Sequence, residues 1–383
     1  REINELVETV LASNDAKNLS AWWLYRLLDT PDQLQEKMTL FWHGHFATGA
    51  EKVREPRLMY RQNQFLREHA LGRFPDLVQG ISRDPAMLIY LDSVTNRKSH
   101  PNENYAREVM ELFCLGEGNY TEKDVQEVAR CFTGWEIRRE KFRFNQFQHD
   151  TGEKTILGET GPFGGEKAVN IILKQKAAPR FIVRKMIRYF MFDEPKPSDA
   201  LVDPLAEKFF NEDYDIARLV ERILTSQLFF SEYCIGRKVR SPIEFAVGLL
   251  RGLESKANVY RLRQELAQLG QELFYPPNVK GWDGGRAWIN SSTLLGRANL
   301  VRGLIEQAKS RFTPDKLAEL ADSHHADSPE KIVDWLVDVL FSVPLPAEVR
   351  LQLVDLANRG GSRGRNIAEV IHAMSILPEF QIG

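Results

Sequence analysis

The fold class of this chain is decided by one stretch, Thr121–Gly134, which reads TEKDVQEVARCFTG. Thr121 is a good helix N-cap, and Asp124 follows three residues later, as in a capping box. Gly134 stands after the last turn, where a glycine commonly ends a helix. The apolar residues between the two ends recur at helical spacing on one face: Val125, Val128, Ala129 and Phe132. The stretch therefore predicts an amphipathic helix that is specified at both ends.

The same period recurs along most of the chain. Apolar residues at steps of three and four predict further helices over 1–11, 34–45, 66–77, 179–189, 201–210, 216–228, 242–253, 259–273, 292–311, 314–321, 329–341, 346–358 and 367–376. One region differs, because Phe142 and Phe144 alternate with polar residues and a turn-like Asp-Thr-Gly follows at 150–152. We predict a short β-hairpin there and a glycine-rich loop over 158–165. The expected fold is all-α, a many-helix orthogonal array with a small β-hairpin insertion.

Length and local composition suggest how the chain is divided. At about 150 residues per domain, a chain of 383 residues is expected to contain two to three domains. Apolar density drops near residue 311, before the last helices. We therefore predict a main helical body over 1–311, with the hairpin and loop insertion at about 135–166, and a C-terminal helical portion over 312–383 packed on it.

Composition excludes several classes of protein. Hydrophobic residues make up 43% and charged residues 27% of the chain, which is an ordinary globular mixture. The 51 Lys and Arg residues nearly balance 53 Asp and Glu residues, so no overall charge favours nucleic acid as a partner. No run approaches the roughly 18 apolar residues of a membrane-spanning helix, so we expect no transmembrane segment. The chain opens on Arg1 inside a helix-like segment, and we expect an upstream segment to have been removed.

The three cysteines, Cys114, Cys131 and Cys234, are far apart in the sequence and fit no zinc spacing. They cannot all pair within one chain. We predict that they are buried and behave as small hydrophobic residues.

His43 and His45 are the candidate metal ligands, within the aromatic segment 41–46, FWHGHF. In an extended backbone both imidazoles would project to one side and could share an ion. In a helix they diverge by about 200°, and one ion could not take both. The preceding period indicates a helix, although Gly44 could end it. A divalent metal is the one cofactor that the residues suggest, and a buried, hydrogen-bonded histidine is the alternative.

The segment 101–113, PNENYAREVMELF, has one polar and one apolar face when it is drawn as a helix. Glu103, Arg107 and Glu111 follow each other at four-residue steps and predict an ion-pair ladder. Glu108 borders the apolar face, where partial burial would raise its pKa toward the range of a general acid or base. Glu103 and Glu108 are therefore candidate catalytic carboxylates, and a salt-bridged helix is the alternative.

His149 and Asp150 are adjacent at the predicted hairpin turn. Such a pair can orient a histidine tautomer in catalysis or bind a metal. The Asp-Thr-Gly turn also explains Asp150 without any catalytic role.

The loop 274–288, FYPPNVKGWDGGRAW, is the most distinctive in the chain, because its prolines and glycines exclude regular structure. Trp282 and Trp288 would offer flat faces for sugar rings if they were exposed. The side chains able to bond sugar hydroxyl groups are Asn278, Asp283 and Arg286. The alternative is a loop held on the helical body by two buried indoles.

Five segments in this order resemble a known family. They are 41–46, 101–108, 118–135, His149-Asp150 and 276–282, and the resemblance extends from about residue 28 to 380. The combination is typical of the bacterial domain-of-unknown-function family numbered eighteen hundred. The resemblance implies a predominantly helical protein that is generally made with an export signal. It also implies genes that neighbour those of an exported, sulfatase- or phosphatase-like family. It implies no reaction and assigns no catalytic residue.

Three functional hypotheses follow. The first is an exported protein of the periplasm or cell envelope that acts as a binding or accessory module for polysaccharide through Trp282 and Trp288. The second is a hydrolase, with or without a metal, in which His43, His45, Glu108 and His149 converge. The third is a structural partner of the neighbouring sulfatase- or phosphatase-like protein.

Overall fold

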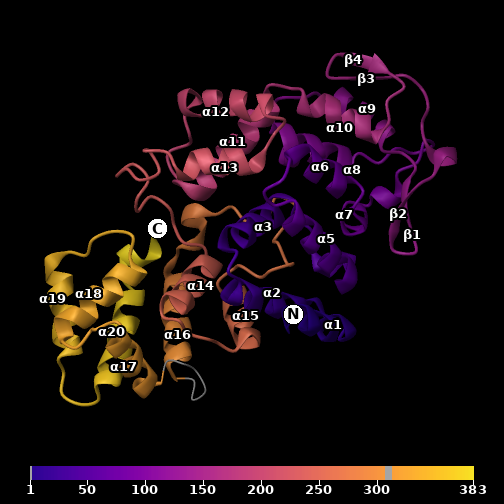
Figure 1. Ribbon diagram of the computed structural model, residues 1–383. Coiled ribbons are helices and arrows are strands. Elements are labelled where there is room, and N and C mark those ends of the chain that lie inside the picture. The colour runs from indigo at the N-terminus through magenta and orange to yellow at the C-terminus, as the bar shows by residue number, and fades with distance from the viewer. Residues whose placement is uncertain (1, 307–312) are drawn as a thin grey trace.

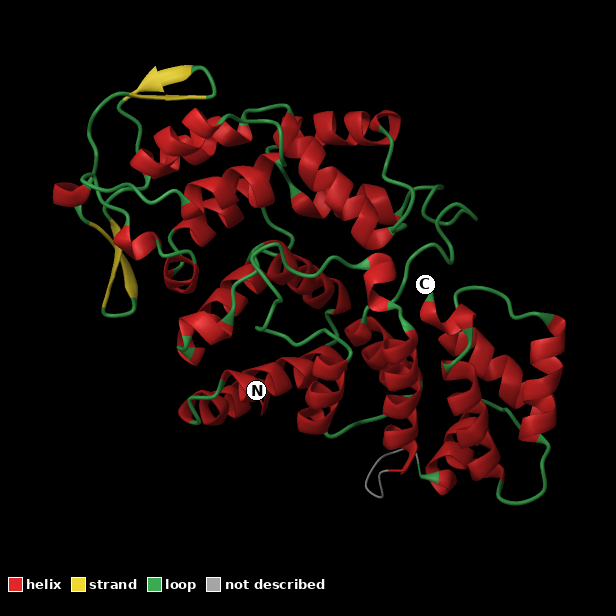
Figure 2. Cartoon of the chain, turned by 180° about the vertical axis from the view of Figure 1, so that it is seen from behind, coloured by secondary structure: helices red, strands yellow, loops and turns green. Residues whose placement is uncertain are grey.

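The computed structural model describes residues 2–306 and 313–383, and their regular secondary structure is helical apart from two small hairpins (Figures 1 and 2). Helices account for 62% of the structure, which confirms the predicted all-α class. The α-helices are α1 (Glu2–Ala12), α2 (Ala16–Asp29), α3 (Gln33–His45), α4 (Ala50–Val53), α5 (Pro56–Glu68), α6 (Phe74–Ser82), α7 (Pro85–Tyr90), α8 (Asn104–Glu108), α9 (Glu122–Cys131), α10 (Gly165–Leu173), α11 (Ala177–Phe190), α12 (Asp199–Asn211), α13 (Ile216–Leu224), α14 (Pro242–Gly252), α15 (Val259–Gln268), α16 (Ser291–Glu306), α17 (Pro314–Ser323), α18 (Pro329–Leu340), α19 (Ala347–Ala357) and α20 (Arg363–Ser375). Short 3₁₀ turns and one π-helix complete the list: η1 (Ser93–Thr95), η2 (Val109–Leu115, the π-helix), η3 (Gln146–Gln148), η4 (Gly285–Trp288) and η5 (Pro378–Gln381).

Helix α9 has the ends that its sequence predicts. The Thr121 hydroxyl accepts a hydrogen bond from the Asp124 amide at 3.2 Å, and the Asp124 carboxylate accepts one from the Thr121 amide at 2.9 Å. This reciprocal pair is a capping box. Gly134 lies just beyond the helix at φ +80°, a conformation that favours glycine.

Two hairpins are present where the sequence predicted one, and the predicted turn at 150–152 was wrong, because it lies in the connection between the two hairpins. Strand β1 (Trp135–Arg138) pairs with β2 (Lys141–Phe144), and β3 (Lys154–Ile156) pairs with β4 (Glu159–Gly161), both antiparallel. Their two-residue turns, Arg139-Glu140 and Leu157-Gly158, have positive φ at both residues, as type I′ turns require. Strand β4 therefore lies where a loop was predicted. It was missed because neither turn carries the Asn-Gly or Asp-Gly pair that marks a hairpin in sequence.

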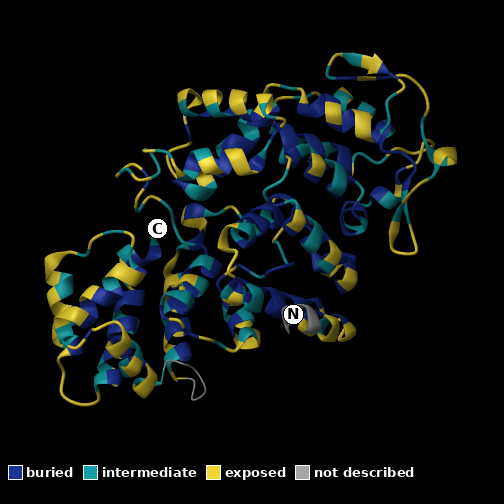
Figure 3. Cartoon of the chain, in the orientation of Figure 1, coloured by how far each residue is buried: buried dark blue, intermediate teal, exposed yellow. Residues whose placement is uncertain are grey.

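The core consists of two clusters of buried apolar side chains. The first joins the end of α3 to α6 through α13, and it includes Trp42, Phe46 and Phe113. The second joins the N-terminal helices α1 and α2 to α14 through α20, and it includes Trp23 and Phe380. In Figure 3, α2 lies near the middle of the molecule and is mostly buried, whereas β2 is mostly exposed. Helices α18 and α20 contact α14 and α16, so the C-terminal helices share a core with the first helices.

Two smaller predictions can be compared with the structure. Cys114, Cys131 and Cys234 are buried and free, as the sequence predicted. Over residues 2–306 and 313–383, no helix is both long enough and apolar enough to cross a membrane.

Candidate functional site

Two of the segments singled out in the sequence meet in space: the end of α3 and the loop 274–288, which we call the tryptophan loop. Gly281 lies so close to α3 that a Cβ atom there would stand 2.3 Å from the carbonyl oxygen of Gly44. Gly281 also has φ +80°, so a side chain is disfavoured by both backbone and space. The next residue, Trp282, has its ring centre 5.8 Å from that of His43. Residues more than two hundred positions apart in the chain thus form one contact.

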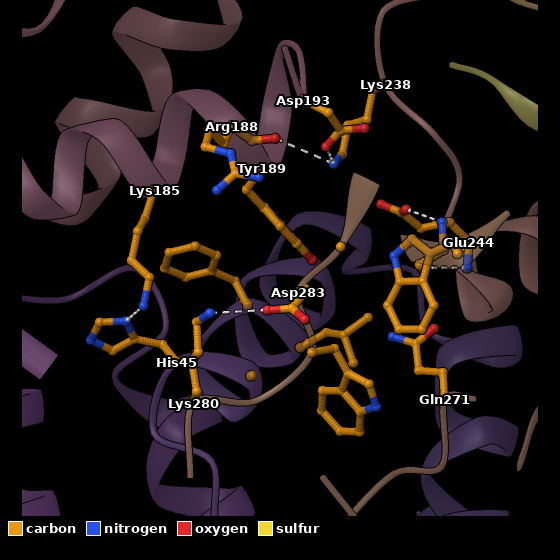
Figure 4. Close-up of a pocket in the computed structure, with 17 residues that line it drawn as sticks. His45, Lys185, Arg188, Tyr189, Asp193, Lys238, Glu244, Gln271, Lys280 and Asp283 are labelled. Carbon is orange, nitrogen blue, oxygen red and sulfur yellow. Dashed lines mark hydrogen bonds and ion pairs between the residues drawn. The ribbon is translucent and has the colours of Figure 1, made fainter. Parts of the chain in front are cut away.

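A cleft opens beside this contact, and we call it the central cleft (Figure 4). It has two adjoining parts, one of about 190 Å³ that we name the inner part and one of about 650 Å³ that we name the outer part. The two parts share Lys185, Arg188, Asp193, Lys280, Trp282, Asp283 and Gly284. The inner part is completed by Leu40, Phe41, Gly44, His45, Tyr189, Lys238, Ser241, Glu244, Gln271 and Trp288. The outer part is completed by Glu111, Leu112, Gly116, Glu117, Phe181, Glu194, Gly285, Arg286 and Ala287.

Lys185 and His45 form a hydrogen-bonded pair on the wall of the cleft (Figure 4). Nε2 of His45 lies 3.0 Å from the carbonyl oxygen of Phe113, which can only accept, so Nε2 carries the proton. Nδ1 therefore accepts from the Lys185 amine at 2.9 Å. Burial and the nearby Lys185 charge hold the pKa of His45 well below its usual range. Burial, together with Arg188 and Lys280, lowers the pKa of Lys185 to about 8.

His43 bonds to a different part of the molecule. Its Nε2 accepts a hydrogen bond from the Phe274 amide at 3.0 Å, and its ring packs between Trp23 and Phe274. Burial lowers the pKa of His43 to about 3, so the ring is neutral. Helix α3 continues through Gly44, and His43 and His45 bond separate partners. Throughout the described part of the chain, no group of three or more His, Cys, Asp or Glu residues is placed to hold a metal ion.

The tryptophan loop contributes both predicted indoles to the cleft, and the two differ in their exposure to solvent. Trp282 is partly exposed, and its Nε1 donates to the Gly270 carbonyl at 3.0 Å. Trp288 is only 9% exposed and lines the inner part of the cleft from below the surface. Trp282 thus has the partial exposure that a platform requires, and Trp288 is buried, as the anchor interpretation expects.

The three polar residues predicted for ligand binding on this loop differ in position. Asp283 lines both parts of the cleft and pairs with Lys280 at 3.1 Å. Arg286 lines the outer part and pairs with Glu194 at 2.9 Å. Asn278 accepts from the Lys280 amide at 2.9 Å and is not among the residues that line the cleft. Asn278 shapes the loop that carries the other two.

The predicted carboxylate helix reaches the cleft only through its continuation. It begins as α8 and passes into the π-helix η2, a rare form often found at functional sites. Burial and the nearby Glu111 charge raise the pKa of Glu108, as predicted. Glu103 pairs with Arg107 at 3.3 Å, as the ladder predicted, but the second partner of Arg107 is Glu122 at 2.7 Å rather than the predicted Glu111. Neither Glu103 nor Glu108 lines the cleft, whereas Glu111 does and accepts from the Tyr120 hydroxyl at 2.5 Å.

His149 and Asp150 belong to the loop between the two hairpins and do not line the central cleft. The His149 ring bonds to the Thr133 carbonyl oxygen at 2.9 Å. Arg130 binds the Asp150 carboxylate at 2.7 and 3.2 Å and lowers the pKa of Asp150 to about 2. The structure thus does not bring His149 together with His45. Instead, His149 and Asp150 attach the loop between the hairpins to the C-terminal end of α9.

Sequence reasoning missed the charged side chains of α11 and α14. Lys185 is partly buried at the edge of the buried stripe of α11, three residues after Ile182 and next to Met186. A lysine at the edge of an apolar stripe was the one signal that could have identified it. Glu244 could not be identified, because its partner Lys37 at 2.7 Å comes from α3. That partner and Lys238 outweigh the effect of burial and lower the pKa of Glu244 to about 2.

Comparison with known proteins gives one result. The family model described as "Protein of unknown function (DUF1800)" matches residues 7–382. No curated protein and no solved structure matches the chain.

Proposed function

We propose that this chain, which belongs to the family of proteins of unknown function DUF1800, is a binding or accessory module that holds a polysaccharide in its central cleft. The observation that carries this proposal is the position of Trp282. Its partly exposed indole lines both the inner and outer parts of the cleft, among polar side chains. An aromatic face beside fixed polar groups is the usual composition of a site for a small polar ligand.

The polar side chains across the cleft from the tryptophan loop are held in place by hydrogen bonds, an ion pair and a cation–π contact. The Tyr189 hydroxyl donates to the Lys37 carbonyl at 2.8 Å, and Lys238 lies 5.6 Å from the centre of the Tyr189 ring. Lys238 also donates to Asp193 at 3.4 Å, while Asp193 accepts from the Val239 amide at 2.7 Å. Because these side chains are already held in one conformation, they can form hydrogen bonds with sugar hydroxyl groups at a lower entropic cost of binding.

The test is retention of the purified chain on a panel of insoluble polysaccharides, followed by calorimetry with oligosaccharides of the retained type. Trp282→Ala should lose retention, and Trp282→Phe, which keeps a flat ring, should recover part of it. Tyr260→Ala is the matched control, because Tyr260 is 52% exposed on α15 and does not line the cleft. Equal retention of Trp282→Ala and the parent, or no retention of the parent on any glycan, refutes the proposal.

Location in the periplasm or cell envelope is part of the proposal, and the sequence resemblance described above supports it. Fractionation of cells that express the full-length gene should find the protein outside the cytoplasm. An accessory role beside an exported sulfatase- or phosphatase-like protein is compatible with this location. Co-purification from the same envelope fraction tests it.

A hydrolase is the second candidate, and the Lys185–His45 pair is the observation that favours it. Both side chains line the inner cleft, and a perturbed amine in a cleft is a common feature of catalytic sites. The predicted set of His43, Glu108 and His149 has less support, because His43 bonds to Phe274, His149 bonds to Thr133, and Glu108 does not line the cleft. Release of reducing ends from the retained polysaccharide, lost in Lys185→Met, would favour this candidate.

A further inference from the structure

We propose that the central cleft binds an acidic group of its ligand, a carboxylate, sulfate or phosphate, between Lys185 and Arg188 of α11. The natural ligand would then be an acidic polysaccharide rather than a neutral one. The choice of polysaccharide rests on the proposed function. The anion site itself rests on the geometry of α11.

Lys185 and Arg188 are the cleft cations that lack a carboxylate partner within the described residues. Lys238 is paired with Asp193, Lys280 with Asp283, and Arg286 with Glu194. Among the residues that the structure describes, the one hydrogen-bond acceptor of the Lys185 amine is the neutral His45 ring. The Arg188 guanidinium is exposed and forms no ion pair with any described residue.

The Lys185–His45 pair leaves two donors available. A lysine amine carries three N–H groups in its charged form. One of them is used by Nδ1 of His45 at 2.9 Å, and the bond from His45 to Phe113 fixes that ring. Because His45 accepts and carries no charge, it orients the amine without neutralising it. The remaining donors can therefore reach an anion in the cleft beside the exposed Arg188.

The charges around Lys185 favour an anion. The groups that influence it are Arg188 on its own helix, Lys280 from the tryptophan loop, Cys114 from η2 and His45 from α3. Burial is the main cause of the lowered pKa of Lys185, and repulsion by Arg188 and Lys280 lowers it further. A bound anion would remove this repulsion and raise the pKa of Lys185 again.

Apart from Glu117, the carboxylates of the same cleft have other partners within the described residues. Glu111 accepts from the Tyr120 hydroxyl, and Glu244 pairs with Lys37. Glu117 is exposed at the outer rim. Trp282 lines both parts of the cleft, as Lys185 and Arg188 do. A sugar ring that lies on this indole would place an acidic substituent within reach of the two cations.

The experiment is calorimetric titration with two groups of probes. The first group is sulfate, phosphate and acetate, and the second is a polyuronate, a sulfated galactan and a neutral glucan. The parent should bind an anion of the first group and should prefer the acidic polysaccharides. Lys185→Met and Arg188→Met should each weaken acidic binding about tenfold or more, because each removes a charge-assisted contact. Lys208→Met on α12 removes the same charge outside the cleft and should bind like the parent.

The outcomes separate the two proposals. Anion binding that depends on Lys185 and Arg188, without binding of any polysaccharide, keeps the anion site and refutes the glycan proposal. Equal binding of acidic and neutral polysaccharides, or unchanged binding by both variants, overturns the anion site alone. Arg188→Met keeps the test valid if Lys185→Met folds poorly, because Arg188 is exposed. Parent affinity should also decrease as the pH rises through about 8, the pKa of Lys185, and Lys185→Met should lack this decrease.

Discussion

Gly281 of the tryptophan loop is in direct contact with the backbone of Gly44 in α3. A Cβ atom on Gly281 would lie 2.3 Å from the carbonyl oxygen of Gly44, closer than any such contact can be. This contact closes one side of the central cleft, since Gly44 and Trp282 both line it. The glycine at 281 is thus a requirement of the tertiary structure.

The first prediction concerns this contact. Gly281→Ala should unfold at lower urea concentration than Gly118→Ala, with a difference of about 1–3 kcal/mol in the free energy of unfolding, because overpacking forces the loop away from α3. Gly118 is the matched control, since it has φ +82° but no atom within 4 Å of a Cβ there. Equal stabilities of the two variants would show that the backbone conformation, and not the contact, sets the requirement. Gly281→Ala should also lose polysaccharide retention.

The second prediction concerns the buried carboxylate of Glu36. It accepts from Trp23 at 2.8 Å, and it pairs with Arg26 and Arg67 at 2.5 Å each. Breaking such a buried pair from one side leaves a charge without a partner, so Glu36→Gln should lower the free energy of unfolding by about 3–5 kcal/mol. Glu122→Gln, which breaks an exposed pair with Arg107, should have a small effect. Denaturant unfolding at pH 7 measures both.

Glu36 should also make the free energy of unfolding depend on pH in the acid range. Burial alone would raise the pKa of Glu36, but Arg67, Arg26 and Trp23 outweigh it, and the net shift is downward. A carboxyl group with a lowered folded-state pKa stabilises the protein above its unfolded pKa, near 4.5, and this stabilisation is lost as the pH falls below that value. Stability curves from pH 7 to pH 3 should therefore be flatter for Glu36→Gln than for the parent. Parallel curves would contradict this assignment.

The third prediction concerns His43. Its folded pKa of about 3 lies below the ordinary value of 6.5, so only the unfolded chain takes up a proton between these values. Stability from this group is complete above pH 6.5 and decreases by about 1.4 kcal/mol per pH unit below it. His43→Gln keeps an acceptor for the Phe274 amide, and it should lose this slope between pH 6 and 4.5. The exposed His100→Gln should keep the slope of the parent.

The fourth prediction concerns thiol reactivity. All three cysteines are buried, and burial raises the pKa of the Cys234 thiol and raises that of Cys131 to about 12. Because the thiolate is the reactive form, a disulfide reagent should label none of them rapidly in the native protein. The same reagent should count three thiols after unfolding. Rapid labelling of one thiol in native buffer would place that cysteine at the surface.

Several features of the fold, and one loop of the site, were predictable from the sequence. Periodicity and capping identified α9 correctly, because both signals are local and depend on residues within one or two turns. The partial burial of Glu108 was also predicted, since its position on the helix places it beside the apolar face. Composition alone predicted that the loop 274–288 has no regular structure, and η4 is the one short helical turn that it contains. Strand β4 was missed because its turn has no local signature.

The sequence by itself determined the helical class, the ends of α9 and the burial of the cysteines, because each depends on nearest neighbours along the chain or on hydrophobic residues avoiding water. Only the tertiary structure decided which polar residues share the central cleft. It brought Lys185 to His45 and Gly281 to Gly44, and it left His149 with Thr133. The physical reason is that a site depends on distances between side chains of different elements, and the packing of those elements sets these distances.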